Sequence, residues 1–300
     1  VSKKSVCIFI TSFLPWMMKH AENSPERTWI IMIIIGEKIN GAIPSIKKAI
    51  AEHDEALIVE RTLAQAKAGA DFLDCAPSTA TDIEYETMVW LIGLMQGVTQ
   101  TPLCIDSPNA KLLARILGEG HVARPGMVNS VNEEGDKCET IFPLIAGTPW
   151  HVVGLTCDRD GIPADPEKKI DIAKRIIDKA DKYGVALNQL HIDPCVMAIA
   201  TMPTSMKDFE RCIRGIHEYA PTVKVTGAIS NISFDMPARK YVNMNCMAYA
   251  IAAGLDSAIM DPCNMDMIGT ICACEALTMK DKGGRKYNRA YRQGRFGVKK

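Results

Sequence analysis

The sequence lacks an excess of charge of either sign, because 35 lysines and arginines balance 35 aspartates and glutamates. Chains that attract nucleic acid or an acidic membrane surface carry a strong positive field. It also lacks an apolar run near its start that is long enough to span a bilayer. The largely apolar run over residues 6–18 has about 13 residues, whereas a spanning helix needs about 20. We therefore expect neither a nucleic-acid nor a membrane partner.

Paired cysteine spacings are also missing. Eleven cysteines are scattered along the chain, an odd number without the regular pairing of a disulfide scaffold. Such usage is typical of a reduced, cytoplasmic protein. The histidines are equally dispersed, so we predict no metal site. Glycine-rich nucleotide loops are absent as well, since residues 36–40 do not form a dinucleotide fingerprint and no phosphate-binding loop occurs.

The two ends of the chain differ from its middle. Residues 1–31 contain a basic pair and an apolar run, but no small-residue cleavage site follows. We expect a poorly ordered N-terminal extension there, with a targeting peptide or an integral helix as alternatives. Residues 279–300 hold nine lysines and arginines against one aspartate, so they form a basic C-terminal tail. The middle, residues 32–278, is expected to be one domain.

Apolar runs that end in polar residues recur eight times in this middle part. The distances between successive ends average about 32 residues, which is the length of one strand, one helix and two loops. We predict eight strands within residues 32–37, 70–74, 102–106, 126–129, 150–157, 189–193, 225–231 and 258–261.

The segments between these runs read as helices. Residues 54–68 carry apolar residues at helical spacing, and Asp165-Pro166 combines a capping residue with a proline suited to a first turn. Ser205 is predicted to cap a further helix. Eight strand–helix units predict an α/β fold of the (β/α)8 TIM-barrel type. A doubly wound open sheet is the alternative.

In such a barrel, the carboxyl ends of all strands meet at one mouth, where the active sites of these folds lie. The predicted strand ends carry carboxylates and carboxamides, which closure would gather there. They are Glu37, Asn40, Asp74, Asp106, Asn109, Asn129, Asp193, Asn231 and Asp261. For Asp74, Asn109 and Asp261 a helix-capping role is an equal alternative.

A ring of carboxylates and amides suits a flat heterocycle with a mixed donor and acceptor edge, such as the 2-amino-4-oxo edge of a pterin. No lysine lies at a predicted strand end, except that Lys38 follows the first strand, so Schiff-base chemistry is disfavoured. His191 is interpreted as a satisfied wall residue, with a place beside the site as the alternative.

Six motifs in order resemble the pterin-binding methyltransferase family. They are Gly36-Glu-Lys-Ile-Asn40, Ile105-Asp-Ser-Pro-Asn109, Asn129-Ser-Val-Asn132, Gly154-Leu-Thr156, Ile192-Asp-Pro194 and Gly227-Ala-Ile-Ser-Asn231. The family contains the methyltetrahydrofolate:corrinoid protein methyltransferases and the folate module of cobalamin-dependent methionine synthase. The resemblance covers about residues 32–277.

The resemblance implies roles for individual residues. Asp106, Asn129 and Asp193 would hold the pterin edge, Gly227 would line it, and Asn231 would approach N5 as the catalytic residue. Further support is expected from Glu37, Asn40, Asp74, Asn109, Ser230 and Arg239. Two positions depart from the acetogenic members, which carry Asn where this chain has Asp74-Cys75-Ala76 and Gln where it has Phe234.

The resemblance also implies an enzyme that moves a methyl group between N5 of tetrahydrofolate, as its 5-methyl derivative, and the cobalt of a corrinoid (cobalamin). The chain lacks an Asp-x-His-x-x-Gly cobalamin box, so a separate corrinoid protein is expected as partner. A homodimer and a role in catabolic demethylation or one-carbon metabolism are implied too. The alternatives are a non-catalytic folate-binding barrel and a dihydropteroate synthase-like enzyme.

Overall fold

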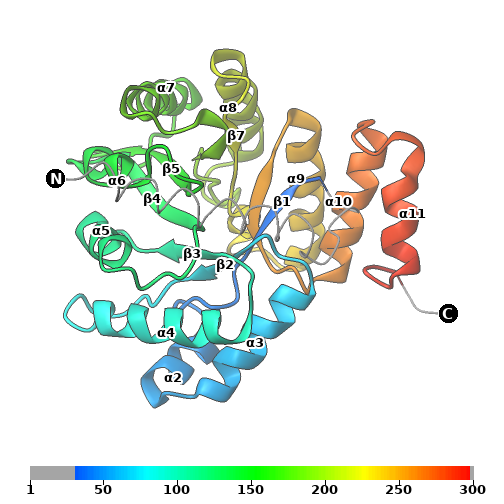
Figure 1. Ribbon diagram of the computed structural model, residues 1–300. Coiled ribbons are helices and arrows are strands. Elements are labelled where there is room, and N and C mark those ends of the chain that lie inside the picture. The colour runs from blue at the N-terminus through cyan, green and yellow to red at the C-terminus, as the bar shows by residue number, and fades with distance from the viewer. Residues whose placement is uncertain (1–30, 298–300) are drawn as a thin grey trace.

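The computed structural model describes residues 31–297, in which strands and helices alternate (Figure 1). The predicted N-terminal extension lies outside the described residues, except for Ile31. The strands are β1 (Ile33–Gly36), β2 (Phe72–Cys75), β3 (Leu103–Asp106), β4 (Met127–Glu133), β5 (His151–Asp158), β6 (Leu190–Asp193), β7 (Lys224–Val225) and β8 (Ser257–Met260).

The strands form one parallel sheet in the order β7-β6-β5-β4-β3-β2-β1-β8. Backbone bonds join its two ends, because Asp256 N donates to Val225 O at 3.0 Å and Ile259 N to Gly227 O at 3.1 Å. The sheet therefore closes on itself, and the predicted (β/α)8 barrel is confirmed. Apart from β1 and β8, neighbouring strands in the sheet are neighbours in sequence, as in barrels of this class.

The helices lie outside the strands (Figure 1). They are α2 (Pro44–Glu52), α3 (Glu55–Lys67), α4 (Glu84–Val98), α5 (Ala110–Gly118), α6 (Lys137–Ile145), α7 (Pro166–Tyr183), α8 (Ser205–Tyr219), α9 (Arg239–Ala253), α10 (Met265–Leu277) and α11 (Arg285–Arg292). As predicted, Asp165 caps α7 by accepting from Glu167 N at 3.0 Å, and Pro166 starts that helix.

Two local expectations are wrong. Ser205 does not cap α8. It is the first residue of that helix, and its buried hydroxyl donates to Met197 O at 2.7 Å. The strand predicted for residues 225–231 ends at Val225, and Ile229–Ser233 forms the 3-10 helix η2 instead. The physical reason is that the run of small residues after Val225 continues the apolar pattern without fixing an extended backbone.

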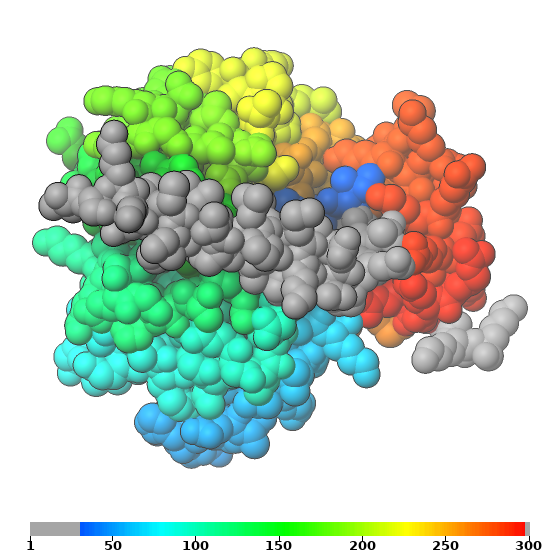
Figure 2. Space-filling view, in the orientation of Figure 1, coloured from blue at the N-terminus to red at the C-terminus, as the bar shows by residue number. Residues whose placement is uncertain are grey.

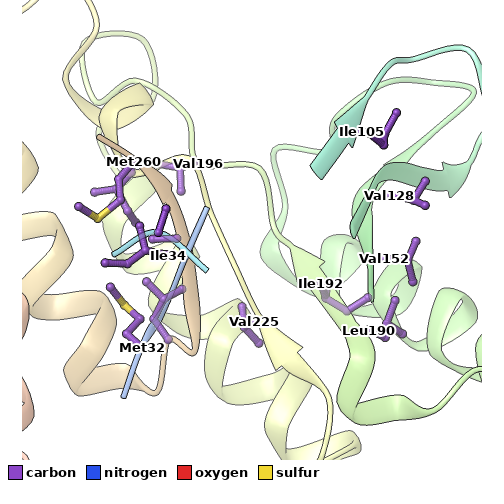
Figure 3. Close-up of a cluster of buried hydrophobic side chains, with 14 of the residues drawn as sticks. Met32, Ile34, Ile105, Val128, Val152, Leu190, Ile192, Val196, Val225 and Met260 are labelled. Carbon is purple, nitrogen blue, oxygen red and sulfur yellow. The ribbon is translucent and has the colours of Figure 1, made fainter. Parts of the chain in front are cut away.

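Apolar side chains fill the barrel and the layer around it. Alternate strand residues point inward, and Ile35, Phe72, Cys104, Met127 and Val153 form a small inner cluster. The other face of each strand packs on the helices. Figure 3 shows Ile34, Val128, Val152 and Val225 of this outer layer, all fully buried. Most strand residues on both faces are thus apolar, with His191 and Ser257 near the strand starts as buried polar exceptions.

The segment after α10 packs on the barrel. Helix α11, at the red end of the colour scale in Figure 2, lies against α10. It buries Ala290, and the loop after it buries Phe296, whose ring centroid lies 4.9 Å from that of Tyr287. No helix among residues 31–297 has the length and apolar character needed to cross a membrane.

Candidate active site

Asp106, the last residue of β3, lies directly opposite Asn129, the third residue of β4. Each lies two residues beyond a side chain of the inner cluster, Cys104 and Met127. Because the side chains of a strand alternate between its faces, the carboxylate and the carboxamide also point inward, at the mouth of the barrel. The structure therefore brings together two of the residues that the resemblance assigns to the pterin.

Asp106 lies in a strongly desolvated position. Burial raises the pKa of its carboxyl group to about 7, and the negative charge of Glu84 adds to the increase. Glu84 is itself buried at the start of α4, where its Oε1 accepts a hydrogen bond of 2.6 Å from Ser107 Oγ. A buried carboxyl group that is costly to ionise by itself gains more from hydrogen-bond donors that a ligand brings.

Asp74 lies on β2 beside this pair and is 1% exposed. Burial raises its pKa well above the usual value, and the charge of Asp106 raises it further. Its Oδ2 accepts from Asn40 Nδ2 at 3.4 Å, while its Oδ1 has no hydrogen-bond partner. The oxygen of the same Asn40 side chain accepts from Ser78 Oγ at 3.3 Å. Asp74 is thus a buried carboxyl group with one free oxygen, not a helix cap.

Asp193 ends β6 and is also buried. Its Oδ1 accepts a hydrogen bond of 2.7 Å from the backbone nitrogen of Cys195. Burial raises the pKa of Asp193 to about 6, whereas this hydrogen bond and the charge of Lys169 act in the opposite direction. The carboxylate is therefore ionised at neutral pH and held in one orientation.

Asn231 lies on the 3-10 helix η2, which Arg239 holds from the start of α9. Arg239 Nη2 donates to Ser230 O at 2.7 Å, and Nε donates to Ser233 Oγ at 2.9 Å. The guanidinium carbon also lies 4.8 Å from the ring centroid of Phe234, which is 47% exposed. We call these two hydrogen bonds from Arg239 to Ser230 and Ser233 the clamp. The ring of Phe234 lies against the guanidinium group of Arg239.

Two further predicted residues have identifiable local positions. Glu37 follows β1, and burial raises its pKa. Gly227 follows β7, and a Cβ atom there would lie 2.9 Å from Phe209 Cζ, so glycine is needed for close packing against α8.

Two residues of the predicted ring have local roles. Asn109 caps α5, because its Oδ1 accepts from Lys111 N and Leu112 N at 3.1 and 3.2 Å. Asp261 pairs with Lys38 at 3.0 Å. For Asn109 the capping alternative therefore describes the observed contact.

His191 is a wall residue with both ring nitrogens satisfied. It contacts His151 Nδ1 at 2.9 Å and Ser257 Oγ at 2.8 Å. His151 and Ser257 are the first residues of β5 and β8, so this group lies at the opposite end of the barrel from the mouth. No cluster of three His, Cys, Asp or Glu side chains suited to a metal ion occurs among residues 31–297.

Sequence reasoning missed the buried Glu84 and Lys169, because their partners lie far away in the chain. A signal for Lys169 exists. It shares the helical spacing of Ala173, Ile176 and Ala180, which are buried on one face of α7. A lysine in register with an apolar stripe predicts a buried cation with a specific partner.

The arrangement can bind an uncharged, flat ligand with several N–H donors. Asp106, Asp193 and Asn129 offer acceptors, and Asn129 also offers a donor. The buried Asp74 Oδ1 and Thr226 Oγ1 have no hydrogen-bond partner within the described chain. Unpaired buried polar groups are rare in native proteins, and a ligand that satisfies them removes their cost.

Comparisons with known proteins agree with this chemistry. The model of the family described as pterin binding enzyme matches residues 42–261. The chain is 46% identical over 268 residues to the methylcorrinoid:tetrahydrofolate methyltransferase of Eubacterium limosum, covering 89% of this chain and 98% of that protein. It is 31% identical over 242 residues to the methionine synthase of Mycobacterium leprae (strain TN), covering 76% of this chain and 20% of that protein.

Solved structures of similar fold include dihydropteroate synthases. The enzyme of Yersinia pestis in complex with a sulfonamide drug has a TM-score of 0.61 at 13% identity, covering 83% of this chain and 95% of that chain. The enzyme of Xanthomonas albilineans in complex with 7,8-dihydropteroate has a TM-score of 0.57 at 17% identity, covering 82% and 92%. At these identities the likeness concerns the fold alone.

Proposed function

The chain belongs to the pterin-binding enzyme family, and we propose that it is a methyltransferase acting between a protein-bound corrinoid and N5 of tetrahydrofolate. The observation that supports the proposal is the position of Asp106 and Asn129 in register on β3 and β4, with Asp193 at the carboxyl end of β6 in the same closed barrel. The similarity to the methylcorrinoid:tetrahydrofolate methyltransferase extends over nearly the whole of both chains. We propose the same direction for this chain, with methylcorrinoid as donor and tetrahydrofolate as acceptor.

The polar ring binds the pterin. The two carboxylates accept the N–H groups of its 2-amino-4-oxo edge, and Asn129 pairs with a donor and an acceptor of the ring. Asp74, Asn40, Glu37 and Gly227 line or support this pocket. Because the pocket is largely desolvated, these contacts are stronger than the same contacts in water.

Methyl transfer is an in-line displacement. The electron pair of N5 forms the new N–C bond, the electrons of the cobalt–carbon bond remain on cobalt, and N5 then loses its proton. Asn231 has a carboxamide that can accept from or donate to N5, so it can orient the lone pair and stabilise the developing charge. One such contact is typically worth about 3 kcal/mol in rate. The residue that fixes Asn231 is Arg239, through η2.

Residues 31–297 form a single barrel. We propose a separate corrinoid protein that docks over the mouth, and a cytoplasmic homodimer that serves one-carbon metabolism or catabolic demethylation. Within the chain, residues 32–278 are the pterin-binding domain, and residues 279–300 are a basic tail, of which α11 packs on α10. Light scattering on a sizing column tests the dimer, whose expected mass is twice the 32.9 kDa of the chain.

A spectral assay tests the function. The protein is mixed with methylcobalamin and tetrahydrofolate, and the cobalt spectrum is followed; the reverse pair is Co(I) cobalamin with methyltetrahydrofolate. The proposal predicts protein-dependent loss of the methylcobalamin spectrum. Tetrahydrofolate binding without exchange in either direction would instead identify a non-catalytic folate-binding barrel.

A further inference from the structure

Lys169 is a buried cation beside the candidate pterin site. It lies in the first turn of α7 and is only 4% exposed. Lysines are almost never buried to this extent without a specific partner, because removing an ammonium group from water is costly. The position therefore calls for a compensating interaction.

The ammonium group contacts the loop that follows Asp193. Its Nζ donates to Pro194 O at 2.7 Å and to Cys195 O at 3.0 Å. Cys195 has a left-handed backbone with a φ of 56°, a conformation that is unfavourable for a side chain of this type. Two hydrogen bonds from one buried cation can hold this turn in place.

The same turn orients the carboxylate. Cys195 N donates to Asp193 Oδ1 at 2.7 Å, so the Pro194–Cys195 peptide, whose carbonyl oxygen accepts from Lys169, also carries the donor to Asp193. The chain of contacts runs from α7 through the loop to the end of β6. A shift of the loop would rotate or release the carboxylate.

We propose that Lys169 is the positioning residue for Asp193, which it keeps oriented and ionised for the pterin. This inference rests on the proposed function, because it assigns Asp193 to substrate binding. A neutral donor would provide the cross-link alone, whereas a cation also opposes the cost of a buried carboxylate. Lys169 is not a catalytic residue, since it acts on the pterin through the loop.

The surrounding charges support this role. The titratable groups that act on Asp193 and its loop are Lys169 from α7, Cys195 from the loop itself and Cys157 from β5. Burial raises the pKa of both thiols, so they stay neutral near pH 7. Burial raises the pKa of Asp193, whereas the hydrogen bond from Cys195 N and then the positive charge of Lys169 lower it, and the net pKa is about 6.

The test is the pH dependence of tetrahydrofolate binding by the full chain. Calorimetric titration from pH 5.5 to 9 should show an acid limb that reflects protonation of the site. In Lys169→Met this limb should move up by about one pH unit or more, and affinity at pH 7 should fall about tenfold. KM for tetrahydrofolate should rise more than kcat falls. The exposed neighbour provides the control, and Lys168→Met should match the parent.

Each outcome decides the matter. An unchanged acid limb and affinity in Lys169→Met would overturn the inference, and so would an equal loss of affinity at every pH with a lower melting temperature, which marks a structural role. If Lys169→Met does not fold, Lys169→Gln, which keeps a donor and removes the charge, decides. An acid limb moved to higher pH at the parental melting temperature supports positioning, whereas an acid limb and KM equal to those of the parent overturn it. Failure of the proposed function can be distinguished from failure of this inference, because in that case the unaltered protein would not bind tetrahydrofolate.

Discussion

Arg239 and Ser230 are joined by a hydrogen bond of 2.7 Å from the guanidinium Nη2 to the backbone carbonyl. This contact links the start of α9 to the 3-10 helix that carries Asn231, and a second bond to Ser233 Oγ makes the link rigid. A planar guanidinium can make both bonds at once, which a lysine cannot do in the same geometry. The position of Asn231 is therefore set by a residue that does not have to touch the substrate.

The first prediction concerns this link. Arg239→Ala should slow methyl transfer about tenfold, because a carboxamide misplaced by a fraction of an ångström loses much of its effect. Binding of tetrahydrofolate should change less than the rate. Single-turnover kinetics measure both. The neighbouring Lys240→Ala, which removes a surface ion pair with Asp266, serves as control, and equal rates in the two variants would contradict the clamp.

The second prediction concerns Asn231 itself. Asn231→Ala should slow transfer by about 10²-fold or more, since it removes the carboxamide that we propose faces N5. The melting temperature should stay close to that of the parent, because the side chain is partly exposed. Stopped-flow spectra of the cobalt give the rate. Asn245→Ala, on an exposed face of α9, is the matched control, and undiminished turnover in Asn231→Ala would remove this residue from the mechanism.

The third prediction separates binding from chemistry. Asp193→Ala should weaken tetrahydrofolate binding by about 1–3 kcal/mol, because pterin donors are left unpaired in a desolvated pocket. The transfer rate at saturating substrate should change less. Calorimetry measures the affinity, and Asp160→Ala at an exposed site should leave it unchanged. Equal affinity in Asp193→Ala and the parent would place the pterin elsewhere.

The fourth prediction concerns stability and pH. The pKa of Asp106 is raised to about 7 in the folded protein, so the folded state binds this proton more tightly than the unfolded state. The resulting stability is fully present below about pH 4 and is lost as the pH rises through 7. Asp106→Asn has no carboxyl group to ionise and so does not lose this stability. The unfolding free energy of the variant relative to that of the parent should therefore increase by about 2 kcal/mol between pH 5 and 8.

Urea unfolding at the two pH values measures this difference. Asp160→Asn, which alters an exposed carboxylate, should show no such trend. If the unfolding free energies of Asp106→Asn and the parent differ by the same amount at both pH values, Asp106 ionises in the folded protein as easily as in the unfolded chain. The same variant should bind tetrahydrofolate less tightly above pH 7, because a carboxylate that accepts paired N–H bonds is lost.

The sequence predicts the barrel well because several strands end where their apolar runs end, although β4 continues to Glu133, four residues beyond its predicted end. Asp106 and Asp193 are the last residues of β3 and β6, as the pattern indicates. The pattern fails after Val225, where Ala228 and Ile229 continue the apolar character while the backbone turns into η2. An apolar run alone does not distinguish a strand from a buried turn. The sequence therefore predicts Asn231 at the end of a strand, whereas the structure has it on the 3-10 helix η2.

Contacts between distant segments are the part that sequence does not predict. Glu84 bonds to Ser107 across 23 positions, and Lys169 reaches Pro194 across 25. Neither pair has a local motif, since each partner is a hydroxyl or a backbone carbonyl. The sequence does show a charged residue at a position of a helix that is otherwise apolar. Such a mismatch between residue type and predicted burial often occurs near a functional site.

The position of the pterin ring in a crystal structure with bound tetrahydrofolate tests the central claim most directly. The account predicts the 2-amino-4-oxo edge within about 3.2 Å of Asp106, Asn129 and Asp193, with N5 facing Asn231. A ring seated in the groove between α2 and the loop after β2, which Lys47, Pro77 and Ile83 line, would contradict it.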